Sequence, residues 1–438
     1  MRLDKLDLWY LGEPFEPRHV GALRLVAAGK GVSLRYSTAW LDTGFALSED
    51  LPLIDVEHLP PGRLQADAPR AVGAVDDARP DRWGEKVIRF VDKPARLSLM
   101  EYLYHAGDDR FGALGVSTSS SAYEPRVGGA LPRLEQARHL SEVVAKIEAS
   151  EPLTSAESRI IAGGGSPLGG AKPKALIDIA GEPWVIKFFN NEPIDTPLVE
   201  HATLTLAGLA GITVPMTRVI DLVGTHALAI RRFDRDGPRR IHCLSAGTAI
   251  RAATIAGDEP QLGYPELARL LRRAGVARDG THQRDARELF RRMVFNILID
   301  NTDDHEKNHA LLISDPFAGT GMTLAPAYDV LPTQSGQGYQ EFICGERGRD
   351  ATLDNAMTQC EAFGLLPAEA AAEVAQVIAV VDTWQAHFAR AGVSARDIES
   401  LAERIDGEAL AAQRRTFDRQ RHALMPARRK RTSPFGRA

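Results

Sequence analysis

Eight consecutive polar residues, 301–308, separate two apolar segments of this 438-residue chain. The preceding segment, 286–300, repeats apolar side chains at helical spacing, and the following one, "ALLIS" at 310–314, is typical of a short strand. A polar run of this kind is most often a solvated loop or a helix cap. Its carboxylates, imidazole, amine and carboxamides nevertheless make it the strongest candidate for a functional site in the chain.

The spacing within this run matches what phosphoryl transfer requires, because one carboxylate must orient an acceptor hydroxyl and hard oxygen ligands must hold Mg²⁺. Asp303 and Asn308 lie five residues apart, which is the D-x-x-x-x-N spacing of kinase catalytic loops. Asp304 competes with Asp303 for the role of the base, but it lies only four residues before Asn308, so the spacing favours Asp303. Asp329, in "YDV", takes the position of a further metal-binding carboxylate.

The other parts of such a site precede this run in the order found in kinases. The glycine-rich loop "GGGSPLGGAKPK", 163–174, could cradle phosphate with its backbone amides. Lys187 lies on the strand "WVIKFF" with Trp184, Ile186 and Phe188 on the opposite face, and Glu200 on the following helix could orient it. Each feature alone is weak, since a lone lysine on a strand usually extends into solvent. Their order together favours a phosphotransferase.

The sequence gives little support for a histidine or cysteine metal site or for disulfide bonds. His305 and His309 are four residues apart and could bind a metal from a helix, but no third ligand follows at a metalloenzyme spacing. The three cysteines, Cys243, Cys344 and Cys360, are far apart and form no CxxC pair, so neither a zinc site nor a disulfide framework is indicated. The simplest interpretation of these three cysteines is that the protein resides in a reducing compartment.

Composition excludes several other classes. Lys and Arg number 53 and Asp and Glu 58, a net charge of −5, so the chain as a whole has no electrostatic attraction to nucleic acid or membranes. The first residues carry charges within their apolar stretch and do not read as a signal peptide, and no apolar run reaches membrane-spanning length. We therefore expect a cytoplasmic protein without a membrane partner.

The chain is too long for one ordinary core, so we expect several units of an α/β (α+β) fold. Residues 1–122 alternate short strand-like stretches with turns, and residues 123–235 contain the glycine-rich loop and a hairpin turning at residues 181–183. Residues 236–425 are mainly helical in pattern, and residues 426–438 form a basic tail.

On these residues the chain resembles the HipA toxin kinase family. The similarity rests on "GGAKPKALI", "VEHATLTLAGLAGITVP", "RRFDR", "FNILIDNTDDHEKNHALL" and "LAPAYDVLP", and on "PDRWGEKVI" and "DDRFGALGV" in the first unit. The resemblance implies a two-lobed, protein-kinase-like core with an N-terminal β-rich subdomain and a mainly helical C-lobe.

The resemblance also implies roles for individual residues. Asp303 is similar to the catalytic carboxylate, Asn308 and Asp329 to the Mg²⁺ ligands, and Lys187 to the lysine that anchors phosphate. The implied ATP-binding residues are Gly169, Gly170, Ala171, Lys172 and Lys174 in the phosphate loop, Arg231, Arg232 and Phe233 at a hinge beside adenine, and Asp234 near the ribose. Ser166 lies where the family carries an autophosphorylated serine, and it reads equally well as a turn residue.

The function implied is that of an ATP- and Mg²⁺-dependent serine/threonine protein kinase, acting as the toxin of a toxin–antitoxin module and linked to persistence. Its expected target is a translation-related protein such as an aminoacyl-tRNA synthetase. Its expected partner is a helix-turn-helix antitoxin, HipB-like, through which DNA is contacted only indirectly. The basic residues 428–431 could touch DNA in such a complex, although a solvated terminus is the simpler interpretation. Two alternatives remain open, a small-molecule kinase of the same fold and a non-catalytic co-repressor that binds the antitoxin.

Overall fold

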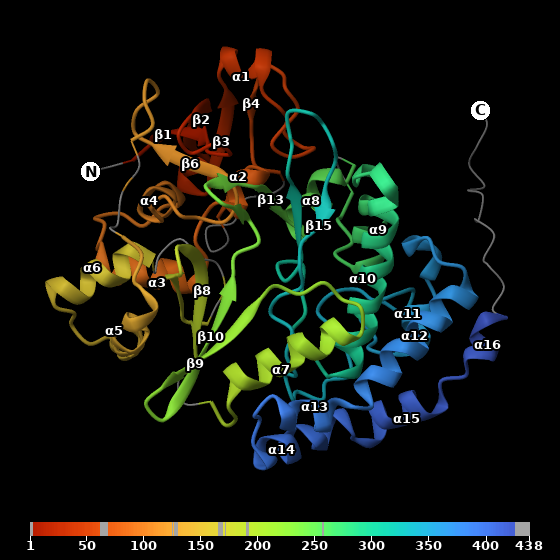
Figure 1. The fold of residues 1–438 in the computed structure, drawn as a ribbon. Helices are drawn as coiled ribbons and strands as arrows, with labels where there is room; N and C mark the ends of the chain where they lie inside the picture. Colours follow the sequence, from red (N-terminus) through yellow and green to blue (C-terminus); the bar gives the residue numbers. More distant parts are fainter. Residues whose placement is uncertain are drawn as a thin grey trace, which may run out of the picture.

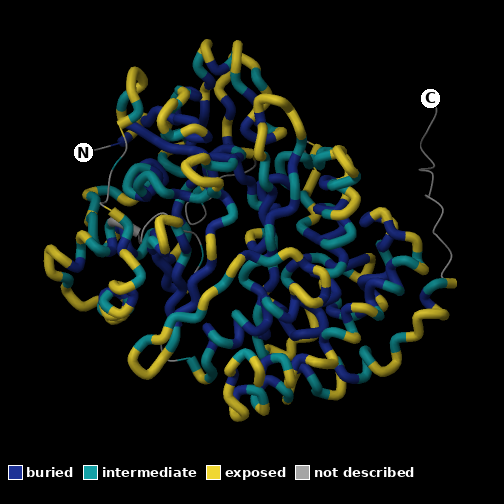
Figure 2. The backbone as a smooth tube through the Cα atoms, in the orientation of Figure 1, coloured by how far each residue is buried: buried dark blue, intermediate teal, exposed yellow. Residues whose placement is uncertain are grey.

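The computed structural model describes residues 3–61, 69–124, 126, 130–164, 170, 172–189, 192–255 and 258–424. Figure 1 shows an N-terminal unit at the top, a second sheet at the centre left and a large helical region at the right and bottom. Exposed residues gather at loop tips and outer helices, and the buried segments run through the interior (Figure 2). Within the described residues, no helix is both long and apolar enough to span a membrane.

The N-terminal unit is built on an antiparallel sheet with the order β4-β3-β2-β1-β6, in which β5 pairs with β3 in parallel. Its apolar strand residues are almost fully buried, as Leu6 and Leu8 of β1 illustrate. The strands are β1 (Lys5–Tyr10), β2 (Arg18–Val26), β3 (Gly31–Tyr36), β4 (Glu57–His58), β5 (Arg70–Ala71) and β6 (Leu114–Ser117); the helices are α1 (Thr38–Thr43), α2 (Ala74–Asp77), α3 (Arg82–Val91) and α4 (Leu99–His105).

The second sheet is antiparallel, with the order β7-β8-β10-β9. One face packs on α5 in an apolar cluster that contains Trp184, Ile186 and Phe188, while Lys187 on the same strand contacts α7, so the predicted pleat alternation is confirmed. The strands are β7 (Lys174–Ile179), β8 (Glu182–Phe188), β9 (Thr217–Leu222) and β10 (Thr225–Arg231); the helices are α5 (Ala137–Ala149), α6 (Ser155–Gly164) and α7 (Thr196–Leu209).

The remaining residues form the helical region around α10, with a small antiparallel sheet of the order β13-β14-β15. The apolar face predicted for α10 is confirmed, because Leu289, Phe290, Met293, Val294, Ile297 and Leu298 are all buried. The helices are α8 (Ala246–Ala253), α9 (Tyr264–Ala274), α10 (Thr281–Leu298), α11 (Leu353–Met357), α12 (Pro367–Val381), α13 (Trp384–Arg390), α14 (Ala395–Ile405), α15 (Glu408–Thr416) and α16 (Arg419–Ala423); the strands are β11 (Arg235–Asp236), β12 (Arg239–Arg240), β13 (His242–Ser245), β14 (Ala310–Ile313) and β15 (Thr323–Leu324). Short 3₁₀ turns lie at Ala27–Gly29, Leu134–Gln136, Arg278–Gly280 and Cys360–Phe363.

Two local predictions are wrong. The hairpin turns at Ala180 and Gly181, both with positive φ, and β8 already begins at Glu182. Glycine adopts this conformation without a steric penalty, which is why the turn centres there. The segment "LAPAYDVLP", 324–332, has a pattern that also predicts a short strand, but no strand continues beyond Leu324, and Asp329 has a φ of 53°.

One apolar cluster runs continuously from Leu6 in β1 to Leu401 in α14. The N-terminal unit therefore shares its core with the helical region, while the second sheet and α5 form a separate cluster that also contains Trp83 and Val87 of α3. The proposed boundaries at residues 122, 235 and 425 stay predictions.

Candidate active site

The centre of the candidate site is a buried group of charges contributed by three distant segments. Lys187 Nζ of β8 lies 2.6 Å from Glu200 Oε1 of α7 and also pairs with Oδ1 of Asp329, in the loop after β15. The side chains of Lys187 and Glu200 are 7% and 1% exposed, whereas that of Asp329 is 34% exposed. The structure therefore brings together three residues that the sequence predicted to share a site.

The protonation of this group follows from its charges. Burial alone would favour neutral forms, but the carboxylates of Asp329 and Glu200 raise the pKa of Lys187 above its ordinary value. Burial likewise opposes ionisation of Asp329, but the ammonium groups of Lys187 and Lys174 hold the pKa of its carboxyl well below its usual range. The site thus contains a charged lysine and an ionised carboxylate across the neutral pH range.

Lys174 supplies a second buried ammonium on the same side of the sheet. It is the direct cross-strand partner of Lys187, so the two side chains leave the same face. Burial lowers the pKa of Lys174, and its Nζ has no hydrogen-bond acceptor among the described residues. Gly170, with a φ of 98°, passes so close that a Cβ there would lie 2.4 Å from this nitrogen. A larger side chain at residue 170 would therefore displace this ammonium, and the Gly170 backbone together with the Lys174 ammonium is called the cradle below.

The first turn of α3 fixes this cradle from the N-terminal unit. The indole Nε1 of Trp83 donates to the carbonyl of Lys174 at 2.7 Å, and its backbone N donates to the carbonyl of Gly170 at 3.1 Å. The segment "PDRWGEKVI" gave no indication of this contact beyond its general resemblance. Of the other phosphate-loop predictions, Lys172 is exposed and pairs with Glu192, whereas Ser166, Gly169 and Ala171 lie outside the described residues.

The two neighbouring aspartates of the polar run have opposite environments. Asp303 is exposed, and its backbone carbonyl accepts a hydrogen bond from Asn308 Nδ2 at 3.3 Å. Asp304 is buried, where it accepts hydrogen bonds from Tyr264 and from His309 Nε2, the latter at 3.0 Å. Only Asp303 is therefore open to an acceptor hydroxyl, while Asp304 anchors the loop to the helical core.

The oxygen ligands predicted for Mg²⁺ fit that ion chemically. The amide nitrogen of Asn308 is turned to the carbonyl of Asp303, and within the described residues its carboxamide oxygen accepts no hydrogen bond. Together with the partly exposed carboxylate of Asp329, it offers the hard oxygen ligands that Mg²⁺ prefers. The alternative of a histidine metal site finds no support, because the described residues contain no group of three or more His, Cys, Asp or Glu suited to a metal.

Two of the predicted hinge residues use their side chains to bind the N-terminal unit. Arg232 and Asp234 are buried and pair at 2.7 Å, and Asp234 also accepts from the Gly112 amide and from Arg235. Arg232 further donates to the carbonyls of residues 109 and 110. Burial opposes ionisation of Asp234, but the two guanidinium groups hold the pKa of its carboxyl well below its usual range. The side chains of Arg232 and Asp234 are thus engaged within the protein, and their predicted place beside the nucleotide stays a prediction.

The other two hinge residues, Arg231 and Phe233, contact different parts of the structure. Arg231 is half exposed and pairs with Glu182 at 2.5 Å. The ring of Phe233 stacks on Tyr328 with a centroid distance of 5.5 Å. Tyr328 in turn donates from its hydroxyl to the carbonyl of Lys307 at 2.7 Å. Sequence reasoning missed Tyr328, which connects the predicted hinge, the predicted catalytic loop (residues 301–308) and the adjacent Asp329.

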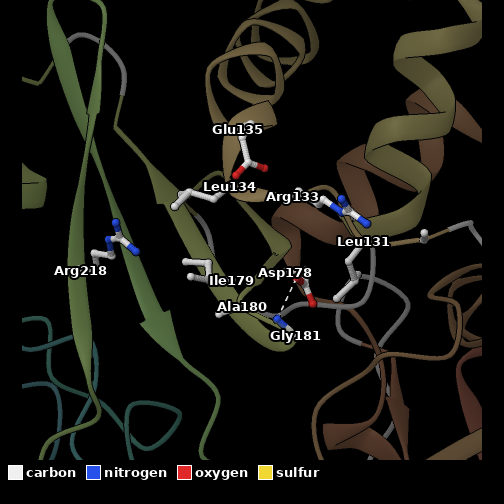
Figure 3. A pocket seen from close by; sticks show the side chains of 10 residues that line it. Leu131, Arg133, Leu134, Glu135, Asp178, Ile179, Ala180, Gly181 and Arg218 are labelled. Carbon is white, nitrogen blue, oxygen red and sulfur yellow. Dashed lines mark hydrogen bonds between the residues drawn. The ribbon is translucent and has the colours of Figure 1, made fainter.

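A hollow of about 900 Å³ lies elsewhere, at the β7–β8 turn (Figure 3). None of the predicted site residues lines it. Its lining residues are Ala130, Leu131, Arg133, Leu134, Glu135, Asp178, Ile179, Ala180, Gly181 and Arg218. The candidate active site is therefore identified by its charges and not by the size of a cavity.

Comparisons with known proteins show which family the chain belongs to. Residues 166–384 match the family model of the HipA-like C-terminal domain. The chain is 32% identical over 170 residues to "Putative kinase Y4dM" of Sinorhizobium fredii, covering 35% of this chain and 38% of that protein. It is 28% identical over 141 residues to "Putative kinase" of Haemophilus influenzae, covering 30% of this chain and 39% of that protein. The chain thus matches less than two-fifths of the length of either relative.

A solved structure extends the likeness in fold to nearly the whole chain. HipA of Shewanella oneidensis MR-1, solved with HipB and its operator DNA, superposes with a TM-score of 0.59 at 16% identity, covering 93% of this chain and 96% of that chain. The predicted fold class, a mixed α/β architecture of HipA type, is confirmed.

Proposed function

The chain belongs to the family of HipA-like C-terminal domains, and from that premise we propose that it is an ATP- and Mg²⁺-dependent serine/threonine protein kinase. The observation that carries the proposal is the convergence of Lys187, Glu200 and Asp329, which are up to 142 positions apart, in one charged group beside the catalytic loop. Structural ion pairs can also perturb pKa values, but they rarely combine a cradle for an anion, free oxygen ligands and an exposed carboxylate.

In this proposal the residues of the chain divide the chemistry among them. Lys187, oriented by Glu200, binds phosphate oxygens together with Lys174 and the backbone at Gly170. Asp303 accepts the proton of the acceptor hydroxyl, which then attacks the γ-phosphorus while ADP leaves. Asn308 and Asp329 would hold Mg²⁺, which neutralises charge on the phosphates. The hinge at Arg231, Arg232, Phe233 and Asp234 would lie beside the adenosine, with the backbone supplying the contacts.

We further propose that the kinase is the toxin of a toxin–antitoxin module. The solved HipA that shares this fold was determined with HipB and operator DNA, which supports a HipB-like antitoxin as partner. We propose that this antitoxin is a helix-turn-helix protein and that the chain contacts DNA only indirectly through it. An aminoacyl-tRNA synthetase is the substrate class we propose, with inhibition of growth as the result. Ser166 remains the proposed site of autophosphorylation.

Incubation of the full chain with radiolabelled Mg·ATP and a cell lysate tests these proposals. Label on a protein band, absent with Asp303→Asn, supports a protein kinase, and identification of that band as a synthetase supports the substrate class. Label found only on a metabolite favours a small-molecule kinase. A chain that transfers no label and gains no thermal stability from Mg·ATP is the non-catalytic co-repressor instead.

A further inference from the structure

An ion pair connects the N-terminal unit to the catalytic loop. Asp81 caps α3, where its Oδ1 accepts from the backbone N of Arg82 at 2.8 Å. Its other oxygen, Oδ2, lies 3.0 Å from Nζ of Lys307, which is 226 positions later and immediately precedes Asn308. The side chain of Lys307 is 49% exposed and that of Asp81 is 27% exposed, so the pair is partly open to solvent and accessible to a ligand.

The backbone on both sides of this pair is fixed by hydrogen bonds, whereas among the described residues the lysine side chain is held by Asp81 alone. Trp83, two residues after Asp81, fixes Gly170 and Lys174. The carbonyl of Lys307 is held by the hydroxyl of Tyr328. Within the described residues, Asp81 is the one carboxylate within ion-pair distance of the Lys307 ammonium. A change of partner at this site therefore requires only rotation of a flexible, half-exposed side chain.

The surrounding charges favour such a change. Lys174 and Lys187 are buried on the wall of the site, and Lys307 adds a third ammonium from the catalytic loop. A triphosphate would bring several negative charges among these cations, and an ammonium–phosphate contact is a strong, charge-assisted interaction. Asp81 carries a single charge in the same region, so it would compete with the terminal phosphate for Lys307.

We propose that Lys307 binds the terminal phosphate of the nucleotide, and that Asp81 is the counter-ion which holds this lysine before the nucleotide binds and releases it when the phosphate arrives. The inference rests on the proposed function and adds a positioning residue from the N-terminal unit to it. The first turn of α3 then contacts both walls of the site, the phosphate cradle through Trp83 and the catalytic loop through Asp81.

The test is the binding of a non-hydrolysable ATP analogue with Mg²⁺, measured by calorimetry on the full chain. Asp81→Asn keeps the helix cap, because Asn caps as well as Asp, and removes only the charge. We expect it to tighten binding of the analogue about two- to fivefold, the range of a partly exposed ion pair. Binding of AMP, which has no terminal phosphate at that position, should not change. Lys307→Met should weaken binding of the analogue, and adding Asp81→Asn to it should have no further effect.

The matched control is Asp55→Asn, which removes another 3.0 Å ion pair of the N-terminal unit, with Arg35, and should leave binding unchanged. Weaker or unchanged binding by Asp81→Asn, or the same tightening with and without Lys307, overturns the inference while the proposed function stands. If the wild-type chain binds no ATP analogue, the proposed function falls and takes the inference with it. Should Asp81→Asn fail to fold, Asp81→Ser keeps a capping oxygen and gives the same comparison.

Discussion

Lys187 Nζ and Glu200 Oε1 lie 2.6 Å apart in an almost solvent-free position, where the pair joins β8 to α7. Its second partner, Asp329, makes this lysine the common member of two ion pairs. These two ion pairs determine where the Lys187 ammonium lies relative to the catalytic loop. The partners of Lys187 are therefore the most direct targets for mutation.

Replacement of Glu200 by Gln should impair catalysis more than folding. Asp329 still neutralises Lys187, so we expect a loss of about 1–3 kcal/mol in the free energy of unfolding, the cost of an unsatisfied buried group. A misplaced ammonium should lower phosphoryl transfer on the order of 10²-fold. Denaturant unfolding and transfer of labelled phosphate measure the two effects. Glu13→Gln, which breaks the exposed pair with Arg239, should change neither, and full activity of Glu200→Gln would refute the assignment.

The neighbouring aspartates of the catalytic loop should separate chemistry from stability. Asp303→Asn should reduce phosphoryl transfer about 10²–10⁴-fold, the usual contribution of a general base, without changing the unfolding curve, because the side chain is exposed. Asp304→Asn should instead lower the free energy of unfolding, since Tyr264 and His309 both donate to this buried carboxylate. A stable, inactive Asp304→Asn variant beside an active Asp303→Asn variant would reverse the two roles.

Asp234 should behave as a structural residue. Asp234→Ala leaves the buried guanidinium groups of Arg232 and Arg235 with only the more distant Asp109 as a shared carboxylate, which should cost about 3–5 kcal/mol of stability. Chemical denaturation measures this loss, with the exposed Asp236→Ala as the matched control. A variant of unchanged stability that binds ATP more weakly would point to a side-chain contact with the ribose instead.

His242 should contribute a pH-dependent component of stability. Burial lowers the pKa of His242 from 6.5 to about 4, and its Nε2 donates to the carbonyl of Leu47 at 2.8 Å. As the pH falls, the imidazole of His242 is therefore protonated in the unfolded chain before it is protonated in the folded protein. The free energy of unfolding consequently decreases as the pH falls from about 6.5 to about 4. At 1.36 kcal/mol per pKa unit the loss is about 3 kcal/mol.

Unfolding of the wild type and of His242→Gln, measured from pH 7 to pH 4, checks this sign. The advantage of the wild type should shrink as the pH falls, because the variant has no imidazole to protonate at this position. His139→Gln, at an exposed position, should run parallel to the wild type. Parallel curves for His242→Gln as well would contradict a buried, neutral imidazole.

Much of the site could be predicted because its signals are local. The alternation of β8 puts Lys187 opposite three apolar residues, and that pattern is visible over seven positions. The spacing between Asp303 and Asn308 likewise lies within one loop. By contrast, the turn at Ala180 and Gly181 was displaced from its predicted position because Pro183, which suggested a turn, instead lies in the hairpin strand β8.

The sequence by itself determined which residue types could perform phosphoryl transfer and on which elements they lie, because hydrophobic periodicity and short-range spacing are properties of neighbouring residues. Only the tertiary structure decided that Arg232 and Asp234 use their side chains to hold the N-terminal unit and that Asp81 meets Lys307. These contacts join segments from about 120 to 226 positions apart. No local pattern encodes such contacts, since they arise only when the N-terminal unit packs against the rest of the chain.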